Sequence, residues 1–207
     1  MHVTLRVRKD AEGLRQKRTF RAIRAALAAG RERFGFRVVQ YSVQGNHIHL
    51  IAEANDRVAL TRGLQGLTIR VALAVNKTRA RKGRVFCDRY HARTLKTPLE
   101  VRHALLYVLR NDRHHLAQRT KQSLPPWSFD PCSSAGEFDG WRDSELLRLA
   151  RQSRRPNRDG ALRSTAEPRS FLLRVGWRRH GLLGLEAAPG ASSVAREGFA
   201  RRGRQSA

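Results

Sequence analysis

The stretch Gly45–Glu53 has the sequence GNHIHLIAE. From His47 onward its residues divide between two sides: Ile48, Leu50 and Ala52 are all apolar, whereas the other side has the mostly polar set His47, His49, Ile51 and Glu53. A period of two is typical of a half-buried strand whose apolar side faces helices. We therefore expect His47 and His49 to share the polar face of a strand.

His47 and His49 form a candidate metal-binding pair. Residues two apart on a strand lie roughly 6.6 Å apart along it and on the same face. Two imidazoles at this spacing can converge on one divalent metal ion and leave its other positions open. Such pairs also occur by chance on polar strand faces, so the pair alone leaves an ordinary surface open as the alternative.

Composition indicates a polyanionic partner. The chain has 207 residues, of which 42 are Lys or Arg and 17 are Asp or Glu, for a formal charge of +25. A basic excess of this size favours nucleic acid, because each phosphate that is neutralised releases condensed counterions. The length suits one domain with an extension, or two small domains.

The same features predict where the protein works. No run approaches the roughly 18 apolar residues of a membrane-spanning helix, and the N-terminus lacks the apolar core of a signal peptide. Cys87 and Cys132 are isolated and have no metal-ligand spacing. We therefore expect a cytoplasmic protein associated with the nucleoid, without a membrane partner.

Elements on both sides of the histidine strand predict the fold class. Periodicity and turn residues predict strands over 3–8, 36–43, 47–53 and 85–93, and helices over 14–33 and 58–78. The order β-α-β-β-α-β is that of an α+β, ferredoxin-like antiparallel sheet. Both of these helices should cover one face, which leaves the other face to carry His47 and His49.

A third helix is expected to supply a nucleophile. Thr97, Pro98 and Glu100 form a capping-box start, and the apolar pattern continues from there through Asn111. Tyr107 and Asn111 are four residues apart and should be neighbours on one helix face. A tyrosine and an amide oxygen beside a two-histidine metal site can perform phosphoryl transfer, in which the phenolate attacks a polarised phosphate. The alternative is a core tyrosine and a helix-end asparagine.

These motifs together resemble the IS200-like transposase family. The run Asn46–Leu50 resembles the HUH motif (His, bulky apolar, His) of single-tyrosine nucleases, and the runs Tyr90–Arg93 and Tyr107–Asn111 resemble the later blocks of the family. The resemblance extends from Met1 to His115 and is strongest to the REP-associated tyrosine transposase branch. Two departures are the Asp112 that follows Asn111, where the family has proline, and a C-terminal part unlike that of compact insertion-sequence enzymes.

The resemblance implies a mechanism and a partner. Tyr107 would attack single-stranded or hairpin DNA and retain a 5′-phosphotyrosine link, and whether strand joining follows cleavage stays open. His47, His49 and Asn111 would bind Mg²⁺ or Mn²⁺. The REP-associated branch favours a monomer, with a dimer as the alternative. The departures leave open whether the protein mobilises an element or processes chromosomal hairpins.

Basic residues near the expected site are candidate DNA contacts, with a solvated surface as the alternative. They are Arg79, Arg81, Lys82 and Arg84 of a loop and Arg89, His91 and Arg93 of the strand that follows. Glu53, on the face of His49, is a possible accessory metal ligand.

The remainder is predicted to be an extension. We place the main domain at residues 1–117, a loop-rich basic extension with short helices at 118–185 and a disordered basic tail at 186–207. A helix over 170–181 is expected either to contact DNA or to pack Leu173 and Trp177 on the main domain. A rival function is hairpin binding without cleavage, which the intact His47, His49, Tyr107 and Asn111 disfavour. An RNA-binding ferredoxin-like module is weaker still, because it requires aromatic residues where the two histidines stand.

Overall fold

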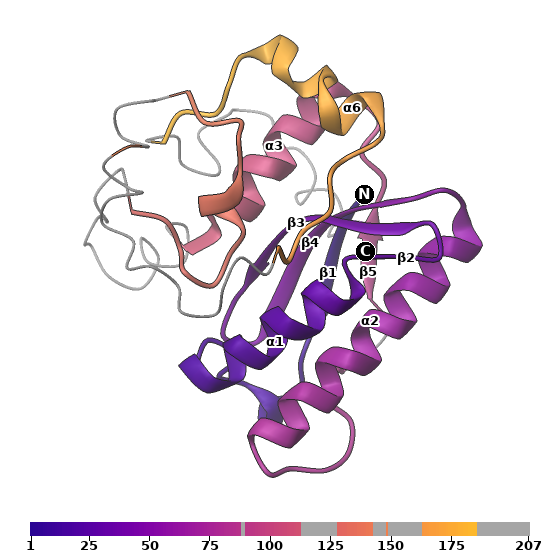
Figure 1. The fold of residues 1–207 in the computed structure, drawn as a ribbon, viewed down its shortest axis with the longest axis vertical. Coiled ribbons are helices and arrows are strands. Elements are labelled where there is room, and N and C mark those ends of the chain that lie inside the picture. The colour runs from indigo at the N-terminus through magenta and orange to yellow at the C-terminus, as the bar shows by residue number, and fades with distance from the viewer. Residues whose placement is uncertain (88–89, 113–127, 143–147, 149–162, 186–207) are drawn as a thin grey trace, which may run out of the picture.

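A single antiparallel sheet forms the centre of the fold (Figure 1). The computed structural model describes residues 1–87, 90–112, 128–142, 148 and 163–185. The strands are β1 (His2–Arg6), β2 (Glu32–Arg33), β3 (Phe36–Val43), β4 (His47–Ala54) and β5 (His91–Arg93). Their order across the sheet is β2-β3-β4-β1-β5. Apart from the two-residue β2, this order is that of a ferredoxin-like sheet, as predicted.

Two helices cover one face of the sheet. They are α1 (Lys17–Gly30) and α2 (Arg57–Thr78), which cross between strands and run side by side in Figure 1. Helix α2 corresponds to the helix predicted over 58–78, and one apolar stripe along it is fully buried: Leu60, Leu64, Leu67, Val71 and Val75. By length and composition α2 could also cross a membrane, but a core helix of a soluble protein satisfies the same criteria, and this stripe packs on the sheet.

The first helix is shorter than predicted. It was expected over 14–33, but α1 ends at Gly30, and Phe34, which follows the expected helix, is 70% exposed. The reason is a tight hairpin between β2 and β3, in which Phe34 has φ 53° and Gly35 has φ 76°. Positive φ at both central residues is the geometry of a type I′ turn.

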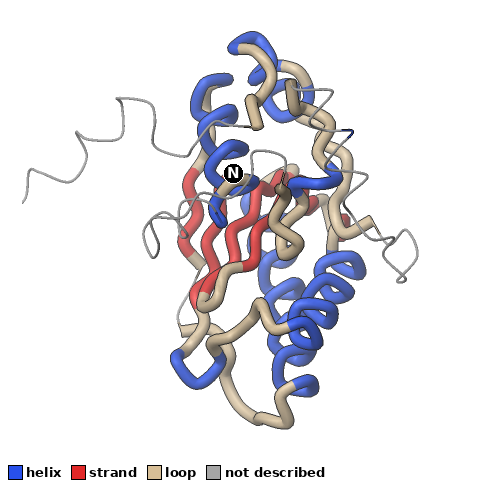
Figure 2. The backbone as a smooth tube through the Cα atoms, turned by 90° about the vertical axis from the view of Figure 1, so that its left-hand side faces the viewer, coloured by secondary structure: helices blue, strands red, loops and turns tan. Residues whose placement is uncertain are grey.

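The second face of the sheet is covered by α3 (Pro98–Leu109) and by C-terminal segments (Figure 2). Val39 and Ile51 of the sheet share a core with α3 and with two deeply buried tryptophans, Trp141 and Trp177. The predicted helix over 170–181 is instead a short α6 (Phe171–Arg174) followed by a 3-10 turn, η3 (Gly176–His180). Of the two roles considered for it, packing is the one observed.

The same C-terminal segments cover the open side of β3, where β2 is too short to pair. The amide of Val43 donates to the Cys132 carbonyl, and the amide of Ala166 donates to the Val38 carbonyl. The Tyr41 hydroxyl lies 3.0 Å from Ser164 Oγ. An exposed strand edge is a template for aggregation, so covering it protects the sheet. Two further 3-10 turns, η1 (Lys9–Ala11) and η2 (Ala135–Glu137), complete the described elements.

The strand predicted over 85–93 is mostly irregular. Only His91–Arg93 pairs as β5, and Phe86 forms an isolated bridge with Val7. Asp56 caps the N-terminus of α2, where its side chain accepts from the Ala59 amide at 2.7 Å.

Candidate metal and tyrosine site

His47 and His49 lie together on the α3 side of the sheet. Strand β4 pairs with β1 so that Arg6 is opposite His47 and Thr4 is opposite His49. The two imidazole centroids are 4.6 Å apart, with an interplanar angle of 82°. His49 is buried, whereas His47 is half-buried. The strand therefore brings the two rings together, as the sequence predicts.

Neighbouring polar atoms orient both rings through Nδ1. His47 Nδ1 lies 2.6 Å from Asn46 Oδ1. His49 Nδ1 lies 3.2 Å from Thr4 Oγ1 and also 3.2 Å from His2 Nε2. Metal-binding histidines commonly donate from one ring nitrogen to a polar partner, which fixes the tautomer and leaves the other nitrogen to bind. A metal ion at this site would thus be bound through Nε2 of both histidines.

Tyr107 reaches the histidines from α3. Its ring centroid lies 5.1 Å from that of His49 at 83°, and 5.6 Å from that of His2 at 64°. The helix is held by the predicted capping box, in which Thr97 Oγ1 accepts from the Glu100 amide at 3.2 Å. Burial raises the pKa of the Tyr107 hydroxyl, so the protein alone keeps it protonated at neutral pH.

Asn111 lies beyond the end of α3. The prediction of one continuous helix through Asn111 is wrong: α3 ends at Leu109, and Arg110 leaves helical geometry with φ −119° and ψ 19°. Buried Arg110 donates to the Ser128 and Leu185 carbonyls, which links this break to the C-terminal segments. Asn111 is fully buried, and neither its side-chain oxygen nor its nitrogen has a hydrogen-bond partner among the described residues.

The donor set fits a divalent metal ion. Two imidazoles and an amide oxygen would make a mixed N/O donor set for a divalent ion, in which the oxygen suits Mg²⁺ or Mn²⁺ and the imidazoles suit Zn²⁺. The buried amide of Asn111 is a polar group whose desolvation an ion would offset. Within the described ranges, no group of three or more His, Cys, Asp or Glu is arranged to hold a metal.

Strand β1 contributes residues that the sequence analysis missed. His2, Thr4 and Arg6 alternate with the buried Val3 and Leu5 and therefore face the histidines. Burial is the main cause that lowers the pKa of His2 to about 4. The alternation along β1 was visible in the sequence. The sequence does not show the register between β1 and β4, which places Thr4 beside His49.

The basic candidates divide into two groups. His91 and Arg93 are exposed on β5, where they pair with Thr4 and His2 and so flank the site. In the loop, Lys82 and Arg84 are exposed. Arg81 is mostly buried and donates to Asp10 at 2.6 Å and to Asn76 at 2.8 Å.

Arg79 likewise has a local partner, because it donates to the Glu12 carbonyl. Arg89 lies outside the described residues. The structure therefore places His91 and Arg93 beside the site, whereas Arg79 and Arg81 form hydrogen bonds to other groups of the protein.

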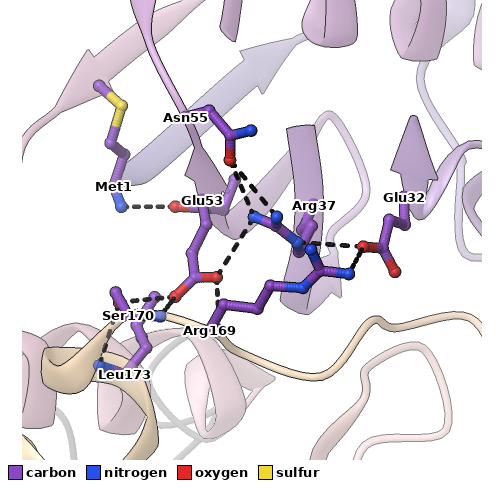
Figure 3. A network of polar contacts seen from close by, with 9 residues as sticks. Met1, Glu32, Arg37, Glu53, Asn55, Arg169, Ser170 and Leu173 are labelled. Atoms are coloured by element: carbon purple, nitrogen blue, oxygen red, sulfur yellow. Dashed lines mark hydrogen bonds and ion pairs between the residues drawn. The ribbon is translucent and has the colours of Figure 1, made fainter. Parts of the chain in front are cut away.

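Glu53 serves the C-terminal segment. Its carboxylate accepts from the backbone amides of Arg169 and Ser170, both at 2.8 Å, and from Ser170 Oγ at 2.6 Å (Figure 3). Arg37 lies on its other side, 3.9 Å away. With these partners Glu53 anchors residues 169–170 to the sheet, which replaces the interpretation as an accessory metal ligand.

Comparison with known proteins supports this arrangement of motifs. The family model described as "Transposase IS200 like" matches residues 1–111, slightly more than half of the chain. That range contains both histidines, the tyrosine and the asparagine. Neither the curated proteins nor the solved structures yield a significant match.

Proposed function

Because the chain belongs to the IS200-like transposase family, we propose that it is a metal-dependent nuclease that cleaves single-stranded hairpin DNA with Tyr107. The family match supports a transposase function that acts on DNA. The choice of Tyr107, the metal ligands His47, His49 and Asn111, and the hairpin substrate are our inferences from the site.

The contact between Tyr107 and His49 carries the proposal. The two rings meet edge to face, with centroids 5.1 Å apart, although they come from different elements. A nucleophile must lie beside the group that polarises its target phosphate, because positioning contributes much of the rate of phosphoryl transfer. No other tyrosine has a described ring contact with His47 or His49.

The reaction exchanges one phosphodiester for another. The Tyr107 oxygen attacks the phosphorus, the bond to the 3′ oxygen breaks, and the products are a free 3′-hydroxyl and a 5′-phosphotyrosine. The phenol proton passes to solvent, and the leaving 3′ oxygen takes up a proton. Bound Mg²⁺ or Mn²⁺ would supply charge stabilisation on the non-bridging oxygens. Attack by a 3′-hydroxyl on the phosphotyrosine reverses these steps and joins strands.

The residues around the site suit a single strand. Arg6, His91 and Arg93 are exposed on the same face as the histidines. The guanidinium of Arg6, and that of Arg93, which also pairs with Glu100 at 3.1 Å, would bind phosphates beside the scissile bond. Tyr107 packs on the sheet of its own chain, which supports a monomer as the active form. A dimer would be needed only if the tyrosine came from a partner.

A suicide-substrate assay tests the proposal. The protein is incubated with labelled hairpin DNA from repeats that flank its gene, with Mn²⁺, and the products are separated on a denaturing gel. We expect a covalent adduct that disappears in Tyr107→Phe and after chelation.

Tyr90→Phe is the matched control, because the chain has three tyrosines and Tyr90 is half-buried outside the site. An adduct that persists in Tyr107→Phe contradicts the assignment of the nucleophile. Tight binding without an adduct on any cognate hairpin would favour the rival function, hairpin binding without cleavage.

A further inference from the structure

Phe34 occupies a conformation that its side chain disfavours. It stands first in the two-residue turn between β2 and β3, with φ 53°, and its side chain is 70% exposed. Asn, Asp or Gly is the usual residue at such a position, whereas a bulky side chain there is strained. An exposed aromatic ring gains no burial that would offset this strain. Strained residues of this kind concentrate at functional sites.

The ring borders a shallow hollow on α2. Phe34 lines it together with Arg62, Gln65, Gly66 and Ile69, and its volume is about 280 Å³. Ile69 is 52% exposed, so the hollow has apolar surface from two elements. Arg62 and Gln65, both exposed, provide polar groups at its rim.

Gly66 leaves the floor of this hollow open. Glycine inside a helix is less stable than alanine there, so its presence needs a structural reason. Gly63 has one, because a Cβ built there would lie 2.2 Å from the Phe36 side chain. At Gly66 the nearest atom to a built Cβ is the Nη1 atom at the flexible end of Arg70, at 3.2 Å. Packing therefore does not require glycine at position 66. The missing side chain instead leaves space beside the guanidinium of Arg70.

We propose that this hollow binds an unpaired nucleobase of single-stranded DNA. The base would stack on Phe34 and contact Ile69, while Arg62 and Arg70 would bind the adjoining phosphates. An aromatic platform flanked by cations is the usual means of holding single strands without reading their sequence. The proposal rests on the proposed function for its partner, but it concerns a different site, on the α2 side of the sheet.

Charge distinguishes this occupant from a second copy of the chain. A symmetric contact through the hollow would bring Arg62 and Arg70 against their own equivalents, in a protein of formal charge +25. Like charges placed together oppose such a contact, whereas phosphates neutralise them. The same cations that disfavour self-association thus favour a polyanion.

The test measures the affinity for single-stranded DNA with cleavage switched off. In Tyr107→Phe protein, a fluorescein-labelled oligothymidylate of about 12 nucleotides, within the usual span of such sites, is titrated by anisotropy. Phe34→Asn should raise Kd roughly tenfold through loss of stacking. The same variant should melt no lower than its parent, because Asn tolerates positive φ.

Leu73→Asn is the matched control, because Leu73 is also an exposed apolar residue (64%) on α2 but does not line the hollow. Its Kd should stay within about twofold of the parent, as expected of a surface change without a role. Arg62→Gln should weaken binding more than Lys77→Gln, which removes an equal charge from the exposed end of α2.

An abasic strand of the same length separates stacking from charge. Phe34→Asn should bind it as tightly as its parent does. The inference is overturned if Phe34→Asn leaves the affinity for oligothymidylate unchanged. It is also overturned if Phe34→Asn weakens binding of the abasic strand as much as binding of oligothymidylate. These binding results do not decide whether the protein cleaves DNA. Cleavage is tested separately, by the covalent adduct of Tyr107 in protein that keeps Phe34.

Discussion

Thr4 contacts the His49 ring from a neighbouring strand, at the same nitrogen as His2. Its Oγ1 lies 3.2 Å from His49 Nδ1, and its backbone is directly opposite His49 in the sheet. If His49 binds the metal through Nε2, then Thr4→Val removes a partner that fixes its tautomer while it keeps the side-chain shape. We expect the affinity for Mn²⁺, measured by EPR, to fall about tenfold, the lower end of the range for outer partners of metal ligands.

Thr61→Val serves as the control for this change. Thr61 is an exposed threonine whose hydroxyl donates to the Arg57 carbonyl within α2, away from the histidines. Its loss should leave Mn²⁺ affinity at the parental value. Equal Mn²⁺ affinity in the Thr4 and Thr61 variants would contradict the positioning role, whatever their melting temperatures.

At the scale of single residues, the sequence predicted site residues that lie at a recognisable spacing within one element. His47 and His49 share a strand face, and the structure places them with Tyr107 as expected. Thr4 and His2 were missed, because the register between β1 and β4 depends on pairing across more than forty residues of chain. A one-residue slip of that register would have turned both away from the site.

Helix α2 contains two glycines with opposite roles, and this contrast gives a prediction at the scale of the element. Gly63→Ala places a methyl group against the Phe36 side chain, where a built Cβ comes within 2.2 Å, so we expect destabilisation by about 1–3 kcal/mol from overpacking. Gly66→Ala meets only the flexible end of Arg70 and should be neutral or stabilising by up to about 1 kcal/mol.

Urea unfolding of the two variants measures both values, and each serves as the control for the other. Equal losses of stability would mean that Gly66 is also required for packing. That outcome would remove one of the three observations behind the nucleobase site, alongside the strain at Phe34 and the lining of the hollow.

Elements were predicted well where their periodicity is long and their ends carry a signal. The α2 stripe and the capping box of α3 are of this kind. The ends of α1 and α3 were predicted less well. Phe34 fits a helical apolar stripe by sequence, and only the hairpin with Gly35 takes it out. Arg110 has no helix-breaking chemistry, so tertiary contacts to Ser128 and Leu185 set the break there.

At the scale of the whole molecule, the C-terminal segments complete the fold. Residues 128–142 and 163–185 supply two tryptophans to the core over α3 and cover the open side of β3. The sequence predicted a loop-rich extension with short helices and named the packing of Leu173 and Trp177 as one alternative. It did not predict the cover over β3, because those contacts reach back about a hundred residues. How the chain divides into independently folding units stays a prediction.

Glu53 on β4 binds the backbone of residues 169–170, so its substitution should lower the stability of the sheet and of the C-terminal segment. Glu53→Gln keeps the shape of the side chain but leaves one of the Arg169 and Ser170 amides without an acceptor. It also removes the negative charge 3.9 Å from buried Arg37, which keeps its ion pair with Glu32 at 3.1 Å. We expect a loss of roughly 2–4 kcal/mol in the free energy of unfolding, as for other broken buried charge networks. Hydrogen exchange should accelerate at the Arg169 and Ser170 amides before it does in α2.

The control is Glu167→Gln, which removes an ion pair with Arg163 of 2.7 Å in which both side chains are more than 70% exposed. Exposed pairs contribute about 0–1 kcal/mol, so this loss should be small although the change in charge is identical. If the two variants lose equal stability, Glu53 does not anchor the C-terminal segment. If Glu53 anchors the C-terminal segment, Glu53→Gln loses more stability than Glu167→Gln, and exchange first becomes faster at residues 169–170. The reason is that this segment detaches from the sheet before the core over α3 opens.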